Sequence, residues 1–258
     1  MKKSLNLTKM SGSGNNFIVI DNRKPLVSNP SVFAKKYCRR EDIDGLLLVE
    51  KSLRRNTDFR MVYYNSDGSH AAFCGNGARC IALFAYLNKI SSAKMVFESD
   101  AGLINAEVKK KSVVKIKMPE PKNFGLDFLL KIAGKKFEAS FADTGVPHTV
   151  IFVKDIKNVD VEHLGRAIRW HKRFQPSGTN VNFVKVLSRN KLQIRTYERG
   201  VEAETLACGT GVVASAIISI LKKYVCSPVN VLTQGGETLK IYYNGRTAFF
   251  EGKVHYIL

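Results

Sequence analysis

The sequence has no long apolar run and no cysteine pattern typical of secreted proteins. No stretch approaches the roughly 18 consecutive apolar residues that a membrane-spanning helix needs. The N-terminus carries the pair Lys2 and Lys3 but lacks the apolar core of a signal peptide, so we expect no secretion. The five cysteines are an odd number, and their spacing forms no disulfide framework. We therefore expect reduced thiols in a cytoplasmic protein that has no membrane partner.

Motifs for metal ions, redox dithiols and nucleotides are also missing. A zinc site needs Cys-x2-Cys pairs or nearby histidines, but Cys74 and Cys80 lie six residues apart and Cys208 has no cysteine close to it. A thioredoxin-like site needs Cys-x-x-Cys, which is absent. The glycine-rich stretches match neither the dinucleotide-binding pattern nor the P-loop pattern. We predict no metal site and no cofactor.

Acidic residues are scarce relative to basic ones, with 22 Asp and Glu against 41 Lys and Arg and a net charge of +19. Such an imbalance can indicate nucleic-acid binding. However, the basic clusters are scattered, at 2–3, 39–40, 54–55, 109–111, 135–136 and 222–223. None is interleaved with aromatic residues as a base-stacking surface would be. We interpret the charge as a solvated surface that can attract an anionic substrate. A nucleic-acid-binding protein is a distant alternative, which a salt-dependent gel shift would test.

A tetrapeptide of the form Cys-Gly-x-Gly occurs twice, at 74–77 and at 208–211. Each copy runs into an apolar stretch, 78–87 or 212–221, and a helix that is apolar almost all round is a buried helix. We therefore predict that each tetrapeptide begins a core helix, where free N–H groups and the positive pole of the helix dipole lie. Glycines there let a ligand approach the backbone. A thiolate at Cys74 or Cys208 would be stabilised by this position.

The second half of the chain repeats the first. Tyr64 and Asn65 precede Cys74 much as Tyr197 and Glu198 precede Cys208, and the stretch 15–17 has an echo at 180–183. Internal repetition of this length predicts two pseudo-symmetric halves. Many short strands and one apolar helix per half predict an α+β fold, with a curled, mostly antiparallel sheet around each central helix. We place the boundary at Pro119-Glu120-Pro121, which gives halves of 1–118 and 119–247.

The local pattern predicts the other elements. Strands are expected at 17–20, 46–49, 59–64, 95–98, 103–108, 113–118, 136–142, 149–153, 181–186, 192–197, 229–232, 239–243 and 248–251. Turns or loops are expected at 11–16, 65–68, 144–148 and 176–180. One helix should begin at Asn29-Pro30, with Pro30 at its first position, and run to about residue 39. Another should be capped by Asp160 and run to about residue 170.

Two thiols in matching settings indicate a base and an acid that work on opposite sides of one carbon. One thiolate would remove a proton and the opposite thiol would return one, so that the stereocentre inverts. The substrate should carry a carboxylate, because helix N-termini bind anions and can stabilise charge that develops there. The expected ligand site is the cleft between the halves. We interpret Cys38, Cys80 and Cys226 as core residues.

These motifs resemble the diaminopimelate epimerase family over the whole chain. The matching stretches are 9–17, 65–69, 74–80, 145–148, 198–200, 204–211, 235–237 and 250–252. The resemblance implies a cytoplasmic, cofactor-independent isomerase that needs no pyridoxal phosphate. It would convert LL-2,6-diaminoheptanedioate to the meso form for lysine and peptidoglycan synthesis. It also implies two like halves, with the last strand, about 248–258, returning to the first half, and a homodimer.

The resemblance further implies a role for each site residue. In the LL-to-meso direction Cys74 is the donor and Cys208 the acceptor. The reacting carboxylate would be held by Gly75, Asn76, Gly209 and Thr210. The distal end of the substrate would be fixed by Asn15, Asn65, Asn180 and Arg199. Glu198 and His148 would orient the reacting end and support catalysis. The alternative interpretations are a simple turn residue for Asn65, a surface charge for Arg199 and a structural loop histidine for His148.

Three positions depart from the family pattern. Many members have Asn where Val146 stands, some have Gln where Gly45 stands, and an acidic residue is common where His70 stands. The first two changes remove side-chain contacts to the distal end of the substrate. A broader amino-acid racemase on the same scaffold is therefore the first alternative. Proline racemases and a phenazine-pathway isomerase have related folds, but their cysteine flanks differ or the cysteines are absent.

Overall fold

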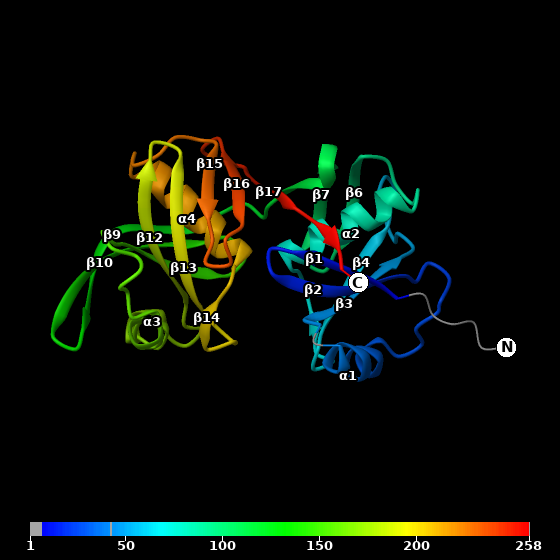
Figure 1. Ribbon diagram of the computed structural model, residues 1–258, viewed down its shortest axis with the longest axis horizontal. Coiled ribbons are helices and arrows are strands. Elements are labelled where there is room, and N and C mark those ends of the chain that lie inside the picture. Colours follow the sequence, from blue (N-terminus) through cyan, green and yellow to red (C-terminus); the bar gives the residue numbers. More distant parts are fainter. Residues whose placement is uncertain (1–6, 42, 258) are drawn as a thin grey trace. The chain divides into compact units, whose positions relative to one another are not determined.

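The computed structural model describes residues 7–41 and 43–257 of the chain, without the side chain at position 111. The lysine pair at 2–3 lies outside these residues. The chain divides into two compact units, Met1–Lys117 with Glu251–Leu258, and Met118–Phe250 (Figure 1). We call them the first and second unit. The predicted α+β fold of two like halves is confirmed. The domain limits 118/119 and 247/248 stay a prediction.

The first unit wraps strands around helix α2 (Gly75–Leu87). Its other elements are β1 (Thr8–Gly12), β2 (Asn15–Asp21), α1 (Pro30–Arg40), β3 (Gly45–Glu50), β4 (Arg60–Asn65), β5 (His70–Ala71), β6 (Lys94–Ser99), β7 (Gly102–Val108), the short helix η1 (Lys110–Ser112), β8 (Val113–Lys117), the end of β17 (Ala248–Lys253) and β18 (His255–Tyr256). Strands β2 and β3 pair in parallel because α1 carries the chain across, whereas β1–β2, β3–β4 and β6–β7–β8 are antiparallel. Helix α2 contacts β1, β2, β3, β7 and β8, and its residues from Gly75 to Ala85 are buried.

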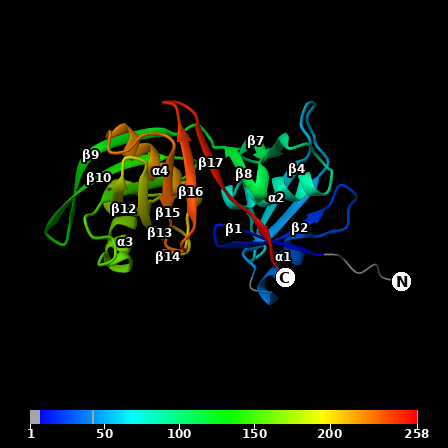
Figure 2. The same ribbon diagram turned by 45° about the horizontal axis from the view of Figure 1, so that its top comes forward.

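The second unit repeats this order around helix α4 (Gly209–Leu221), as Figure 2 shows. Its other elements are β9 (Lys122–Ile132), β10 (Lys135–Asp143), β11 (Pro147–Phe152), α3 (Val161–Arg169), the short helix η2 (Lys172–Phe174), β12 (Asn180–Ser188), β13 (Lys191–Glu198), β14 (Ala203–Thr205), β15 (Val229–Leu232), β16 (Thr238–Tyr243) and the start of β17. Strands β11 and β12 pair in parallel across α3, as β2 and β3 do across α1. Both order and register therefore match β2 with β11, β3 with β12, β4 with β13 and α2 with α4.

The ends of the two surface helices follow the predicted capping. The side chain of Asn29 accepts a hydrogen bond from Val32 N, and Pro30 takes the first helical position of α1. The Asp160 carboxylate accepts from His163 N at the start of α3. These contacts satisfy N–H groups that have no partner within a helix. Both predicted helix starts are confirmed.

One prediction of local structure is wrong, and one long strand was not predicted. Residues Ser11 and Gly12 belong to β1, and the turn before β2 is only Ser13 and Gly14, which both have positive φ. A two-residue hairpin of this kind matches the natural twist of the strands, so pairing extends to the turn. The long strand β9 was not predicted, because Asn123, Gly125 and Asp127 interrupt its pattern. Pairing with β10 supplies the hydrogen bonds that the local sequence does not indicate.

The basic clusters behave largely as predicted. Those at 39–40, 54–55 and 135–136 are exposed. Lys222, at the end of α4, is different, because its side chain is only 6% exposed and forms ion pairs with Asp127 and Glu138. Burial alone would lower the pKa of Lys222, but the bonds to these carboxylates outweigh it and raise the pKa. This lysine contributes to the second unit rather than to a solvated surface.

Candidate active site

Cys74 occupies the N-cap of α2, as the sequence predicts. Its backbone is extended, with φ −140° and ψ 121°, and its Sγ accepts a hydrogen bond from Gly77 N at 3.5 Å. The residue is half-buried. Gly77 lies directly over the core, since a Cβ there would be 3.1 Å from Leu47 and 3.5 Å from Phe17. The thiol therefore lies at the positive end of a buried helix, where a thiolate is stabilised.

Asn15 and Asn76 lie together beside Cys74. Asn76 is buried, and its Nδ2 donates to Asn15 Oδ1 at 2.7 Å. Its Oδ1 accepts from Arg79 Nη2 at 2.8 Å. The fully buried Arg79 also donates to Ser13 Oγ in the β1–β2 turn. Arg79 thus orients the predicted carboxylate-binding asparagine. Arg79 was not among the predicted site residues, although a charged residue within an otherwise apolar helix is a visible signal in the sequence.

Asn65 ends β4, and its amide is held within the following turn. Its Nδ2 donates to Ser69 Oγ at 2.9 Å, and its backbone N donates to Ser69 O at 2.8 Å. Ser69 in turn donates to the carboxylate of Asp67. The side chain is half-buried, so its amide is fixed in direction but still reaches the surface. This geometry fits both a turn residue and a preoriented substrate ligand.

Introducing glutamine at Gly45 should destabilise the first unit. A Cβ at this position would lie 2.5 Å from the backbone O of Tyr64 and 2.6 Å from the ring of Tyr63. Because a backbone atom cannot move aside freely, we expect Gly45→Gln to lower the free energy of unfolding by about 1–3 kcal/mol. Urea denaturation followed by circular dichroism measures this. Gly125→Ala, where the nearest neighbour is at 3.7 Å, is the control. Equal stability of Gly45→Gln and the unaltered protein would contradict the prediction.

Cys208 occupies the N-cap of α4, as Cys74 does in α2. It is 7% exposed, and no side-chain bond caps the helix. Its Sγ lies 3.5 Å from Thr210 Oγ1, and that oxygen lies 2.9 Å from His148 Nε2. The hydroxyl of Thr144 donates to the backbone O of Thr210 at 2.9 Å, which fixes the first turn of the helix. The second thiol is therefore surrounded differently from the first.

His148 is fully buried beneath α4. Burial lowers the pKa of His148 to about 3, with a further contribution from the positive charge of Arg199. The imidazole is therefore neutral near pH 7. Its Nδ1 lies 3.1 Å from Asn182 Nδ2. A neutral ring with one contact on each nitrogen is suited to hold other groups in place.

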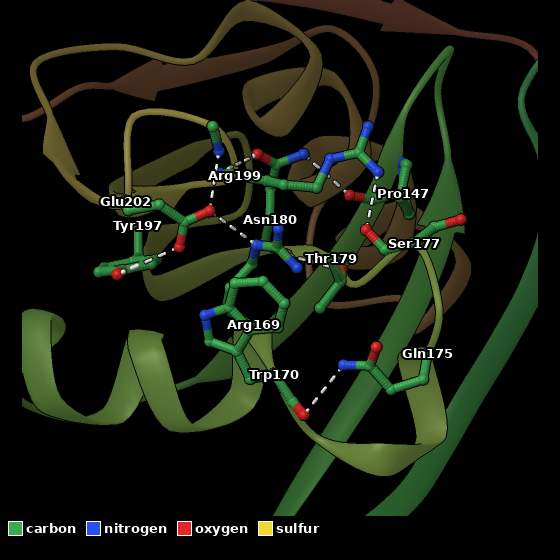
Figure 3. Close-up of polar contacts among 11 residues, drawn as sticks. Pro147, Arg169, Trp170, Gln175, Ser177, Thr179, Asn180, Tyr197, Arg199 and Glu202 are labelled. Carbon is green, nitrogen blue, oxygen red and sulfur yellow. Dashed lines mark hydrogen bonds and ion pairs between the residues drawn. The ribbon is translucent and has the colours of Figure 1, made fainter.

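The predicted distal ligands of the second unit form a second cluster, which Figure 3 shows. Asn180 Oδ1 accepts from Arg199 N at 2.8 Å, and its Nδ2 donates to Pro147 O at 2.9 Å. The Arg199 guanidinium donates to Ser177 O at 3.0 Å. These three bonds join the loops around 147, 177 and 199. They fix the backbone of Arg199 and leave its side chain half-buried at the surface.

The turn that carries Glu198 and Arg199 is tied down at two more points. Glu198 Oε2 accepts from Thr205 Oγ1 at 3.0 Å. Glu202 accepts from Gly200 N at 3.0 Å and from Arg169 Nε at 3.1 Å, which anchors the turn to the end of α3 (Figure 3). Arg169 is buried, whereas the side chain of Glu202 is 31% exposed, so solvent reaches the pair from the Glu202 side. Arg169 and Glu202 were not among the predicted site residues, because they lie far apart in the chain and no local pattern links them.

The register of the strands changes which residues correspond between the halves. Phe17 pairs with Gly45 on β3, and His148 pairs with Asn180 on β12. Phe17 therefore corresponds to His148, and Gly45 to Asn180. Asn15 precedes Phe17 by two residues, as Val146 precedes His148. The echo between 15–17 and 180–183 is wrong, since short sequence similarity does not fix strand position.

The first two departures named above, Val146 and Gly45, each correspond to an asparagine in the other half of the chain. Val146 is the counterpart of Asn15, and Gly45 is the counterpart of Asn180. His70, the third departure, pairs with Asp100 at 2.8 Å between Nε2 and Oδ2. In each of the two corresponding pairs, Asn15 with Val146 and Gly45 with Asn180, one member is an asparagine.

Each unit brings several predicted site residues together. The first holds Cys74, Gly75, Asn76 and Asn15 at one helix start, with Asn65 at the end of β4. The second holds Cys208, Gly209, Thr210 and His148 at the other, while Asn180, Glu198 and Arg199 lie at strand ends. The convergence of the two thiols on one carbon stays a prediction. Among the described residues, no group of three or more His, Cys, Asp or Glu could hold a metal ion, and no helix is long and apolar enough to span a membrane.

Comparison with known proteins identifies relatives over nearly the full length. A family model described as diaminopimelate epimerase matches residues 7–123 and 140–257. A diaminopimelate epimerase of Aquifex aeolicus is 44% identical, with 96% of this chain and 94% of that protein covered. One from Hydrogenobaculum is 42% identical, with 95% and 94% covered. Among solved structures, a Bacillus anthracis phenazine biosynthesis protein of the PhzF family superimposes with a TM-score of 0.75 at 13% identity, covering 98% of this chain and 97% of its own. That last likeness concerns the fold. The chain belongs to the diaminopimelate epimerase family.

Proposed function

We propose that this chain is an isomerase that converts LL-2,6-diaminoheptanedioate to the meso form without a cofactor. The family supports this activity, because full-length relatives carry the name diaminopimelate epimerase. The observation that carries the mechanism is the matched pair of helix starts, each capped by a cysteine. A single helix start of this kind would fit many anion sites. Two of them, with a thiol at each, fit inversion by two opposed groups.

The reaction needs only proton transfers. One cysteine, as thiolate, removes the Cα proton from one face, and the other, as thiol, delivers a proton to the opposite face. In the LL-to-meso direction Cys208 accepts and Cys74 donates, and the reverse reaction exchanges the roles. Backbone N–H groups of Gly75, Asn76, Gly209 and Thr210 bind the reacting carboxylate. They also stabilise the negative charge that moves onto it when the proton leaves.

The remaining site residues recognise and orient the substrate. Asn15, Asn65, Asn180 and Arg199 bind the distal amino acid end. Bonds to Asn76, Ser69 and Pro147 hold the three amides in fixed directions. Glu198 orients the reacting end, together with His148. Preoriented ligands of this kind lose little conformational entropy on binding.

The cellular role follows from the activity. The product would serve lysine and peptidoglycan precursor synthesis in the cytoplasm. We propose a homodimer that binds a small amino acid and neither nucleic acid nor a membrane. The surplus of 41 basic over 22 acidic residues would then help attract a substrate with two carboxylates.

Exchange of the Cα proton in deuterated water tests the proposal directly. The protein is first dialysed against a chelator and checked for the absorbance of bound pyridoxal. With LL-diaminopimelate and no added cofactor, we expect deuterium at Cα and formation of the meso isomer. Nuclear magnetic resonance of the amino acid measures both.

Simpler amino acids provide the matched comparison. Glutamate and aspartate have the reacting end but lack the distal amino carboxylate, and Val146 and Gly45 lack side-chain donors for it. Each lost hydrogen bond is worth about 0.5–1.5 kcal/mol. We expect turnover of diaminopimelate with weak but measurable exchange of glutamate. Exchange of glutamate at an equal rate would favour the broader racemase, and activity that returns only with zinc or pyridoxal phosphate would refute the cofactor-free mechanism.

A further inference from the structure

We propose that Asn182 is a positioning residue that keeps the His148 proton on Nε2, so that the Thr210 hydroxyl donates to Cys208 Sγ. This inference rests on the proposed function only in taking Cys208 as an acid–base group. It concerns a row of side chains from three elements of the second unit: Asn182 on β12, His148 on β11, and Thr210 and Cys208 at the start of α4. Asn182, His148 and Cys208 are buried, and Thr210 is half-buried. The orientation of the Asn182 amide determines which atom donates in each hydrogen bond along this row.

The direction of the Asn182 amide is set by two neighbours. Asn182 is completely buried, so each polar atom needs a protein partner. The terminal amide atom on one side of the Asn182 side chain lies 3.1 Å from the backbone O of Thr149. A carbonyl oxygen can only accept, so this amide atom must be the donating nitrogen, Nδ2. The other side accepts from Thr196 Oγ1 at 3.0 Å. The NH2 group therefore faces Thr149 O, and the same group lies 3.1 Å from His148 Nδ1.

The amide in turn fixes the histidine. An NH2 group can only donate, so Nδ1 of His148 must be the accepting nitrogen. The ring is neutral, because its burial lowers the pKa to about 3. A neutral imidazole carries one proton, which therefore lies on Nε2. This N–H points at Thr210 Oγ1, 2.9 Å away.

The histidine then fixes the hydroxyl. Thr210 Oγ1 accepts from Nε2, so its own proton points elsewhere. Cys208 Sγ lies 3.5 Å from this oxygen, within the range of a hydrogen bond to sulfur. A hydroxyl that donates to sulfur stabilises the thiolate more than the neutral thiol, because bonds to charged acceptors are stronger. The row thus favours the form of Cys208 that accepts the Cα proton.

The first unit shows that the fold does not require this row. In the register of the parallel strands, Phe17 on β2 takes the place of His148 on β11. On the neighbouring strands, Leu47 on β3 takes the place of Asn182 on β12. Gly77 packs on Leu47 and Phe17, whereas Gly211 packs on Asn182 and His148. Leu47 pairs with Tyr63 on β4, and Asn182 pairs with Thr196 on β13. Tyr63 therefore takes the place of Thr196. The same helix start is therefore built on apolar residues in one unit and on polar residues in the other.

This difference points to function. Burying polar side chains is unfavourable unless each is bonded, and an apolar pair already fills the same space in the first unit. Of the two helix starts, the one at Cys208 has the polar row beneath it, and the one at Cys74 has the apolar pair. It therefore makes the two thiols unequal, which suits a pair in which one rests as base and the other as acid.

The first test locates the proton on His148. Protein labelled with ¹⁵N-histidine gives a long-range ¹H–¹⁵N spectrum in which the two neutral tautomers have distinct patterns. His148→Phe, which copies Phe17, assigns the signal among the five histidines. We expect the Nε2–H form in the unaltered protein. A proton on Nδ1 would overturn the proposal without any bearing on epimerase activity.

The second test follows the thiol. Iodoacetamide reacts with thiolates, and mass spectrometry reports the rate for each cysteine peptide separately. We expect about tenfold slower alkylation of Cys208 near pH 7 in Thr210→Val, with Thr210→Ser close to the unaltered protein. Asn182→Leu, which copies Leu47, should also slow Cys208 and release the Nδ1–H form of His148. Cys74 and Cys226 are internal references; Cys226 is exposed, so its interpretation as a core residue is wrong, whereas Cys38 and Cys80 are buried.

Two further variants keep this test decisive. Asn182→Leu leaves the buried Thr196 hydroxyl without its acceptor, so the pair Asn182→Leu with Thr196→Val serves if the single variant does not fold. Ser219→Ala removes another buried hydroxyl of α4, far from Cys208, and should change neither readout. Unchanged alkylation of Cys208 in folded Thr210→Val and Asn182 variants would overturn the proposal. Loss of epimerisation with both readouts as expected would instead refute the proposed function alone.

Discussion

Replacing Cys208 with serine should lower the rate of diaminopimelate epimerisation by at least about 10²–10⁴-fold. A serine hydroxyl is far less acidic than a thiol, so its ionised form is almost absent near neutral pH. The fold should survive, because serine is nearly isosteric with cysteine and is a favoured N-cap residue. The surviving Cys74 can still work on the face of the substrate that it reaches. Interconversion of the LL and meso isomers, followed by chiral chromatography, measures the loss.

The two single variants should then differ in a defined way. Elimination from a 3-halo analogue requires removal of one proton and loss of halide, so it needs a base on one face only. Cys208→Ser should act on the isomer whose Cα proton faces Cys74, and Cys74→Ser on the opposite isomer. Cys226→Ser, at an exposed thiol outside both helix starts, is the matched control. A near-native rate of epimerisation in Cys208→Ser, or the same isomer preference in both variants, would refute the opposed-thiol mechanism.

Acidification should destabilise the second unit through His148. The unfolded chain takes up a proton on this histidine below about pH 6.5, whereas the folded protein does so only near pH 3, because burial and the nearby Arg199 lower the pKa. The unfolded state therefore binds more protons between these values. The contribution of His148 is fully present above about pH 6.5. It is lost as the pH falls, by up to about 1.4 kcal/mol per pH unit.

Urea denaturation at several pH values measures this effect. Fluorescence of Trp170, the only tryptophan of the chain and part of the second unit, follows the transition. Carboxylates also titrate in this range, so the difference between the unaltered protein and His148→Phe isolates the histidine. His163→Gln, at an exposed position of α3, is the control. A His148→Phe variant that loses stability on acidification as steeply as the unaltered protein would contradict the assignment.

The sequence alone determined the features that depend on neighbouring residues. Apolar stretches after Cys74 and Cys208 predicted two buried helices, because a helix without a polar face can only be in the core. Asn29-Pro30 and Asp160 predicted helix starts, because capping bonds span only three residues. The recurring order of motifs predicted two like halves. Periodicity and capping are local, so they can be recognised without knowing the partner elements.

Only the tertiary structure decided what depends on the pairing of distant segments. Strand β9 owes its form to β10, and the correspondence of Gly45 with Asn180 follows from the register of parallel strands. The row from Asn182 through His148 and Thr210 to Cys208 joins β12, β11 and α4. Nothing in the separate stretches predicts that an amide on one strand selects the tautomer of a histidine on the next. Side-chain contacts across a sheet are fixed by register and burial, which the whole fold sets, and this is why the two chemically similar thiols acquire different surroundings.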